Sequence, residues 1–203
     1  MRKITHTLLL LALCLSVASC SKDEDDTINF IGDSIIEIWD LHRSFPTLIT
    51  HNYGKSSSGL RHVENYAGRF HESTAVVMTG TNDLYSIVKA AAELNSRETE
   101  ISNYVNRYEL AVEALDASKV YIISILPRGR DANTDPDFSN SYIREINLCL
   151  KQSAQLHGWK FIDAYTPLSD SEGIMLDEYT HDGVHPCDAG YEVLTRLLQQ
   201  HLL

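Results

Sequence analysis

The sequence predicts an α/β protein in which helices cover both faces of a parallel β-sheet. One observation is that short apolar runs of strand length alternate with longer segments in which apolar residues recur at helical spacing. Another is that each of the first three runs is followed by a short polar motif. Ligands bind beyond the carboxyl ends of the strands in such sheets, so these motifs predict one shared site.

Five apolar runs are expected to form the strands. They are residues 27–31, 48–52, 75–78, 120–125 and 160–162. The segments between them carry the helical patterns, and it is this alternation of strands and helices that favours parallel pairing.

Four helices are expected from the spacing of apolar residues. The segments 84–94 and 101–115 each place their apolar residues on one side of a helix. A third helix covers residues 139–157 and stops at Gly158, a residue type suited to a helix C-cap. The last helix, over residues 188–201, again has one apolar side.

The N-terminal segment is expected to lie outside the fold. Residues 1–19 have a basic head, a short apolar run and small residues at the end, which is typical of a secretory signal peptide. Residues 17–20 (Val-Ala-Ser-Cys) resemble a bacterial lipobox, in which cleavage leaves Cys20 as an acylated N-terminus; an ordinary signal peptide is the alternative. Residues 20–26 then form the lipidated cysteine and an acidic tether, and residues 27–203 a single domain. We therefore expect an exported cell-envelope protein, an outer-membrane lipoprotein facing the periplasm or the cell surface.

The charge of the chain excludes some partners. Removal of residues 1–19 would take away Arg2 and Lys3 and no acidic residue, so the formal net charge of −11 would become −13. Such a charge repels phosphate backbones and anionic lipid headgroups. We expect no nucleic-acid partner and membrane contact only through the N-terminal lipid. The sequence leaves the oligomeric state open.

Two cysteines remain after the lipid site. An exported compartment permits a disulfide between Cys149 and Cys187. The alternative is a buried free thiol at Cys149, which lies among apolar positions of an expected helix. Neither cysteine has a His or Cys partner at ligand spacing, so we expect no metal site.

Two motifs far apart in the chain supply a serine, a histidine and an aspartate. Residues 32–34 (Gly-Asp-Ser) follow the first strand, and residues 182–185 (Asp-Gly-Val-His) precede the last helix. A serine hydroxyl becomes a nucleophile when a base takes its proton, and the base works best when a third group orients it. We interpret Ser34 as the nucleophile, His185 as the base and Asp182 as its orienting carboxylate. The alternatives are a helix N-cap at Ser34 and an ordinary Asp-Gly turn.

With two further motifs, residues 52–54 (Asn-Tyr-Gly) and 80–83 (Gly-Thr-Asn-Asp), the chain resembles the SGNH hydrolases, the GDSL group of esterases and lipases. The resemblance spans nearly the whole expected mature chain. It implies a three-layer, flavodoxin-like fold with a five-stranded parallel sheet, and ester hydrolysis without a metal or cofactor. Residues 125–129 (Ile-Leu-Pro-Arg-Gly) and 52–63 are similar to the catalytic subunits of platelet-activating-factor acetylhydrolase.

The resemblance also implies an oxyanion hole. Its donors would be the Asn82 side chain and the backbone N–H groups of Ser34 and Ser57. The family usually reads Asn-x-Gly-x-x-Gly in this region, and here Ser57 takes the place of the second glycine. A backbone donor survives that change provided that the backbone does not require a positive φ. The alternative for Asn82 is an ordinary turn residue.

Two arginines follow the fourth expected strand, at the same end of the sheet as the motifs. Arg128 and Arg130 are candidates for contacting a sugar or an acidic substrate, and Arg128 is our substrate-binding candidate. The alternative is that both are solvated loop residues.

These observations predict a serine esterase for short acyl groups, acetyl above all, because no long apolar lid segment is evident. Exported members of the family often deacetylate glycans, so carbohydrate O-acetyl esters are the expected substrates. One alternative is a lysophospholipase or thioesterase acting on longer acyl chains. Another is a surface lipoprotein that binds glycans on an inactive scaffold. Ser57 favours that last alternative, and the presence of Ser34, Asn82, Asp182 and His185 together opposes it.

Overall fold

The computed structural model describes residues 27–132 and 135–203. It contains a five-stranded sheet in the order β2-β1-β3-β4-β5, and every pair of neighbouring strands is parallel. This is the strand order of flavodoxin-like folds, so the expected fold class is confirmed. The expected signal peptide, lipid site Cys20 and acidic residues up to 26 lie outside the described residues.

The strands are β1 (Thr27–Gly32), β2 (Ile49–Gly54), β3 (Thr74–Met78), β4 (Lys119–Ile123) and β5 (Lys160–Ile162). Their bounds agree with the five predicted runs to within two residues at each end. The chain passes from β1 to β2 on one side and then crosses to β3 on the other, which makes the β1–β3 boundary the switch point where ligands bind in such sheets.

The register brings the carboxyl ends of three strands to one level. Gly32, the last residue of β1, lies opposite Gly54 of β2 and Met78 of β3. The segments that follow these strands therefore leave the sheet side by side, and they are the segments that carry the polar motifs.

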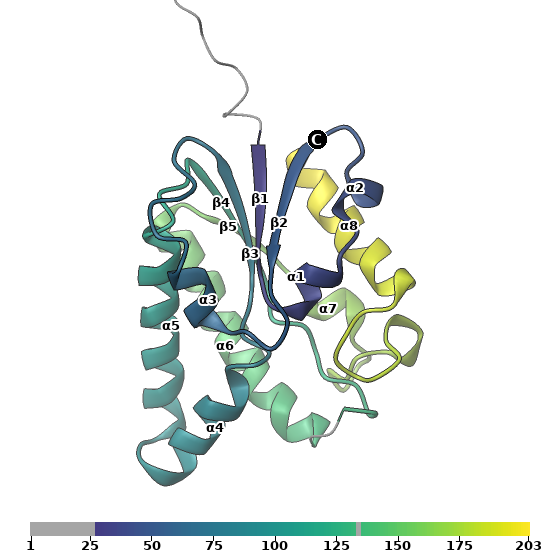
Figure 1. Cartoon of the computed structure of the whole chain (residues 1–203). Coiled ribbons are helices and arrows are strands. Elements are labelled where there is room, and N and C mark those ends of the chain that lie inside the picture. The colour runs from purple at the N-terminus through teal and green to yellow at the C-terminus, as the bar shows by residue number, and fades with distance from the viewer. Residues whose placement is uncertain (1–26, 133–134) are drawn as a thin grey trace, which may run out of the picture.

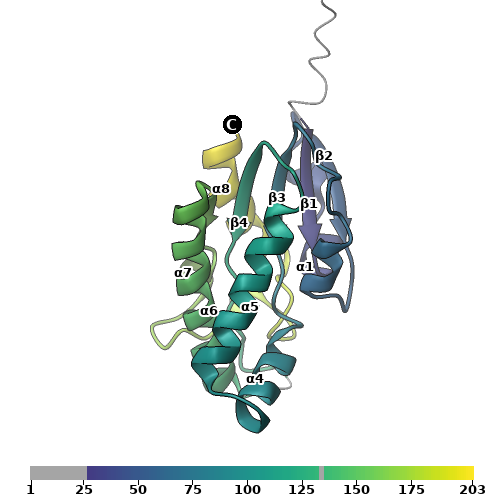
Figure 2. The same ribbon diagram turned by 90° about the vertical axis from the view of Figure 1, so that its left-hand side faces the viewer.

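Helices cover both faces of the sheet, as Figures 1 and 2 show. One core contains side chains of α3, α5 and α6, and the other contains side chains of α1, α2, α7 and α8. Strand β1 serves both cores, because Phe30 points to one face and Ile31 to the other. The helices are α1 (Ser34–Ile38), α2 (Leu41–Ser44), α3 (Leu60–Glu64), α4 (Leu84–Glu93), α5 (Arg97–Glu113), α6 (Pro136–His157), α7 (Tyr165–Leu168) and α8 (Asp188–Leu202), with a 3₁₀ turn η1 (Asp177–Tyr179).

The four predicted helices correspond to α4, α5, α6 and α8. The structure starts α5 one turn earlier than expected, because Ser96 Oγ accepts a hydrogen bond from Thr99 N–H and caps the helix before its apolar periodicity begins. Helices α2, α3 and α7 were not predicted, since a single turn is too short to show a periodicity. Gly158 follows α6 with a φ of +72°, as suits a helix C-terminus.

Within the part of the chain that the structure describes, no helix combines the length and apolar character needed to cross a membrane.

The close approach of β1 to β3 predicts the effect of a substitution at Gly32. A Cβ atom there would lie 1.9 Å from the carbonyl oxygen of Met78. Because the obstacle is backbone in the centre of the sheet, we expect Gly32→Ala to lower the free energy of unfolding by about 3 kcal/mol, measured by denaturant titration.

Gly68→Ala is the control, since a Cβ atom at Gly68 meets no atom within 4 Å. Its positive φ alone should cost about 1 kcal/mol. A Gly32→Ala protein no less stable than the control would contradict the assigned packing of β1 on β3.

Candidate active site

Ser34 is the first residue of α1, directly after β1. The N-cap of this helix is Asp33, whose Oδ1 accepts a hydrogen bond from Ile35 N–H at 3.0 Å. The alternative interpretation of Ser34 as the N-cap is therefore wrong, because the preceding carboxylate already satisfies the free N–H group. The Ser34 hydroxyl is left to interact elsewhere, and the residue is 8% exposed.

The two expected partners of Ser34 lie beside it. Ser34 Oγ is 2.9 Å from His185 Nε2, and His185 Nδ1 is 2.7 Å from Asp182 Oδ2. With a proton on Nδ1 held by the carboxylate, Nε2 is free to accept the serine proton. The structure thus joins residues 151 positions apart in one chain of hydrogen bonds.

The loop that carries Asp182 and His185 is held by its own hydrogen bonds. Asp182 Oδ1 accepts from the N–H groups of Val184 and His185, at 2.8 and 2.7 Å. Thr180 Oγ1 donates to the carbonyl of His185 and accepts from Gly183 N–H. Thr180 is buried, and sequence reasoning missed its role because a single threonine near a turn forms no recognisable motif.

Asp182 remains ionised over a wide pH range. Partial burial acts to raise its pKa, but hydrogen bonds from the His185 side chain and from the backbone N–H groups of His185 and Val184 outweigh it and lower the pKa to about 2. A carboxylate at this position favours a positive charge on the adjacent imidazole.

Asn82 lies in the segment after β3 and faces the segment after β2. Its side-chain amide donates one hydrogen bond to the carbonyl of Ser58 at 2.7 Å. The neighbouring Asp83 accepts from Leu60 N–H at 2.9 Å, with Gly59 against its carboxylate. The two segments are thereby tied together, and the second amide hydrogen of Asn82 has no acceptor among the described residues.

The backbone conformation of Ser57 decides whether this position requires a positive φ. Its φ is +57°, in the left-handed region that favours glycine. The condition stated above, that the backbone at this position does not require a positive φ, is therefore not met. Ser57 nevertheless adopts the conformation that a glycine would take, and no acceptor among the described residues binds its N–H.

Arg128 and Arg130 have different environments. Arg128 is half-buried, and its Nη2 donates to the carbonyl of Thr81 at 2.9 Å, which braces the segment that holds Asn82. Arg130 forms surface ion pairs with Asp170 and Glu172. The solvated-loop alternative therefore describes Arg130 only.

The backbone of Arg128 is fixed by Asn140, a residue that sequence reasoning missed. Asn140 is fully buried in α6, where its Oδ1 accepts from Arg128 N–H and its Nδ2 donates to the Arg128 carbonyl. Only the tertiary contact reveals this function, because a buried asparagine in a helix carries no sequence signal.

Several buried polar atoms have no hydrogen-bond partner among the described residues. They include Asp33 Oδ2, Thr79 Oγ1, Arg128 Nε and the hydroxyls of Tyr104 and Tyr108. Burial raises the pKa of Asp33 to about 7; the charge of Asp83 acts in the same direction, while the Ile35 hydrogen bond and the charges of His185 and Arg128 oppose it. Asp33 is thus largely protonated below neutral pH, unlike Asp182.

Both remaining cysteines are free and half-buried, so the structure contains no disulfide between Cys149 and Cys187. Cys187 precedes α8, and its thiol donates to the carbonyl of Glu178. Over residues 27–132 and 135–203, no cluster of three or more His, Cys, Asp or Glu side chains is arranged to hold a metal ion.

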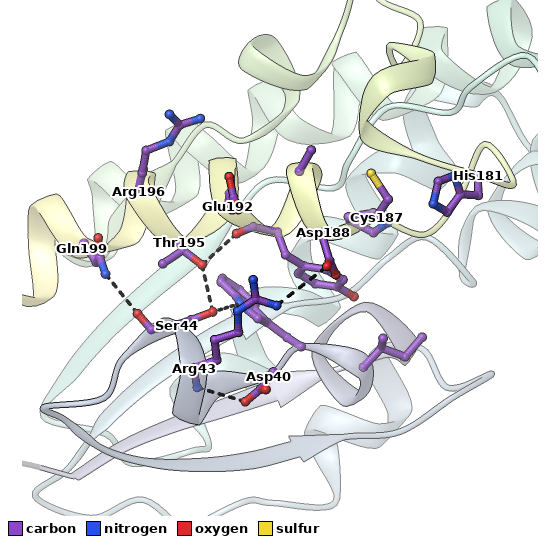
Figure 3. Close-up of a pocket in the computed structure, with 15 residues that line it drawn as sticks. Asp40, Arg43, Ser44, His181, Cys187, Asp188, Glu192, Thr195, Arg196 and Gln199 are labelled. Carbon is purple, nitrogen blue, oxygen red and sulfur yellow. Dashed lines mark hydrogen bonds and ion pairs between the residues drawn. The ribbon is translucent and has the colours of Figure 1, made fainter.

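A groove of about 800 Å³ runs between α2 and α8 (Figure 3). It begins at His181 and Pro186, which flank the Asp182 and His185 loop, and Ser34 does not line it. Hydrogen bonds from Thr195 and Gln199 to Ser44 cross its floor. Charged side chains line much of the rest: Asp40, Arg43, Asp188, Glu192 and Arg196.

Known proteins resemble the chain along most of its length. A profile of the GDSL-like Lipase/Acylhydrolase family matches residues 30–193. The human platelet-activating factor acetylhydrolase IB subunit alpha1 is 26% identical over 194 residues, which cover 90% of this chain and 78% of the human protein.

Two solved structures share the fold. A GDSL-like lipase from Bacteroides thetaiotaomicron superposes with a TM-score of 0.67 at 22% identity, covering 88% of each chain. A variant of an acetyl xylan esterase from Geobacillus stearothermophilus gives a TM-score of 0.62 at 17% identity, covering 87% of this chain and 94% of the esterase.

The environment of Asp33 predicts a pH-dependent contribution to stability. Its pKa is about 7 in the folded protein against 3.8 ordinarily, so the folded state binds the proton more tightly. The stabilising contribution is complete below about pH 4 and is lost as the pH rises to 7, by roughly 4 kcal/mol. The free energy of unfolding of wild type, measured relative to Asp33→Asn, should fall across this window.

Asparagine keeps an Oδ1 acceptor for Ile35 N–H and cannot ionise, which makes it the matched variant. A difference in unfolding free energy that stays constant from pH 4 to pH 8 would show that Asp33 titrates normally.

Proposed function

Because the chain belongs to the GDSL-like Lipase/Acylhydrolase family and is an ester hydrolase, we propose that Ser34 is its nucleophile, His185 its general base and Asp182 the carboxylate that orients the imidazole. The observation that carries the proposal is the unbroken hydrogen-bond chain from Ser34 Oγ through both ring nitrogens of His185 to Asp182 Oδ2. This is the arrangement that activates a serine hydroxyl.

The reaction proceeds in two halves. Ser34 Oγ attacks the ester carbonyl carbon while His185 Nε2 takes the hydroxyl proton, and His185 then gives that proton to the oxygen of the departing alcohol. The acyl group remains on Ser34. A water molecule, deprotonated by His185, attacks the acyl carbon, and the proton returns to Ser34 as the carboxylic acid leaves.

The negative charge on the tetrahedral intermediate is received by three donors: the N–H groups of Ser34 and Ser57 and the side-chain amide of Asn82. The hydrogen bond from Asn82 to Ser58 supports this role, because it fixes the amide before substrate binds. Arg128 supports it indirectly through Thr81, and this contact makes bracing of the Asn82 segment a better-supported role for Arg128 than substrate binding. Loss of one such donor typically lowers the rate about 10²- to 10³-fold.

The substrate class we propose is a short-chain ester, with acetylated carbohydrates as the leading candidates. The names of two similar proteins, an acetylhydrolase subunit and an acetyl xylan esterase, support the acetyl group. The groove beside the catalytic loop combines aromatic side chains, Trp39 and Tyr191, with charged residues such as Asp188, a mixed lining that can receive a sugar.

We expect Ser34→Ala to abolish hydrolysis of p-nitrophenyl acetate by residues 27–203, lowering kcat at least 10³-fold, since the attacking oxygen is removed. Ser102→Ala is the control, because Ser102 is exposed on α5 and belongs neither to the proposed catalytic group nor to the groove beside it. Wild-type kcat/KM should fall steeply from the acetate to the octanoate ester.

Turnover that peaks on octanoate and still requires Ser34 would move the assignment to a lysophospholipase or thioesterase. A wild type that neither hydrolyses any of the esters nor is labelled by a fluorophosphonate would instead indicate a glycan-binding protein without catalysis.

We also propose that the domain is exported and held at the cell envelope by a lipid on Cys20. The lipobox-like residues 17–20 and the acidic segment after them support this localisation. Cys20→Ala, expressed in a Gram-negative host, should move the protein from the detergent-soluble membrane fraction to the soluble fraction. Retention of the variant in the membrane fraction would rule out anchoring by that lipid.

A further inference from the structure

The Ser57 backbone N–H, a proposed oxyanion donor, belongs to a residue whose positive φ is energetically unfavourable. A non-glycine residue in the left-handed region is roughly 1–2 kcal/mol less stable than in its preferred conformations. Ser57 is also exposed, so no packing of its side chain offsets that cost. The surrounding structure must therefore hold residues 55–59 in this conformation.

One side chain holds the residue before Ser57 directly. Glu37, on α1 three residues after Ser34, accepts hydrogen bonds through Oε2 from both the backbone N–H and the hydroxyl of Ser56; the N–H bond is 2.8 Å long. Both are charge-assisted bonds, which are stronger than those between neutral groups. Glu37 thus connects the helix that begins at the nucleophile to the residue beside the oxyanion donor.

The start of this segment is fixed separately, so Glu37 acts on the turn itself. Asn52 Nδ2 donates to the carbonyl of Ile36 at 2.7 Å, and Lys55 N–H donates to the carbonyl of Gly32 at 3.1 Å. Beyond Lys55, the bonds to Glu37 are the ones that tie Ser56 to the α1 side of the site. On the other side of Ser57, Ser58 donates to the carbonyls of Lys55 and Gly32 and accepts from the Asn82 side chain.

We propose that Glu37 is a positioning residue: by binding Ser56 it holds Ser57 in the left-handed conformation and so keeps the Ser57 N–H in the oxyanion hole. The inference rests on the proposed function and deepens it. It also explains how this chain carries a serine where the resembled family has a glycine. A glycine adopts a positive φ freely and needs no such support, whereas a serine does.

The test uses kcat and KM for p-nitrophenyl acetate. In Glu37→Ala the turn is free to relax and one oxyanion donor is lost for much of the time, so we expect kcat to fall at least tenfold, with KM within twofold. Ser57→Gly in the same background should restore kcat to within about threefold of wild type, because glycine does not need the support. Glu37→Gln retains a neutral acceptor and should lose less than Glu37→Ala.

Glu93→Ala is the matched control, an exposed carboxylate on α4 removed in the same way. A Glu37→Ala protein with wild-type kcat overturns the proposal, and so does a loss of kcat that Ser57→Gly fails to restore. If Glu37→Ala does not fold, as judged by circular dichroism, the same criteria apply to Glu37→Leu, a larger side chain that also cannot accept these hydrogen bonds. Ser34→Ala distinguishes failure of the proposed catalytic function from failure of the proposed role of Glu37. If Ser34→Ala hydrolyses the ester as fast as wild type, the catalytic assignment is refuted, whatever the result for Glu37.

Discussion

The in-register parallel pairing of β1 with β2 and β3 is the constraint on which the site depends. It brings Gly32, Gly54 and Met78 to one level. At that level the backbones approach so closely that a side chain on Gly32 would meet β3, and one on Gly54 would meet α1. Because β1 lies between β2 and β3 and α1 begins two residues after it, Ser34 follows the central strand, between the two segments proposed to bind the oxyanion.

Asp33 and Asp182 are both associated with the site, but their different surroundings give the two carboxyl groups very different pKa values. Asp33 is buried, its second oxygen has no hydrogen-bond partner among the described residues, and its pKa rises to about 7. Asp182 lies in a partly exposed loop that surrounds it with donors, and its pKa falls to about 2. Only the second can supply a lasting negative charge to His185, which agrees with the role proposed for it.

Sequence reasoning predicted the elements whose apolar residues follow a repeating pattern. It missed residues whose role depends on a particular hydrogen bond in the folded protein. The five strands and four long helices carry a periodicity, and they occur where it places them. Asn140 and Glu37 each bind a residue 12 or 19 positions away, and Thr180 binds several groups of its own loop; no pattern in the neighbouring sequence indicates these contacts. Ser57 was recognised as a departure from a motif, but its backbone conformation was not.

By itself, the sequence determined the fold class, the position of the polar motifs at one end of the sheet, and the residues that could form a hydrolytic site. These follow from periodicity and from the rule that strand ends in a parallel sheet share an edge. The tertiary structure decided the hydrogen-bond chain from Ser34 to Asp182, the raised pKa of Asp33 and the contact of Glu37 with Ser56. Each depends on atoms from segments distant in the chain, whose separation and burial exist only after folding.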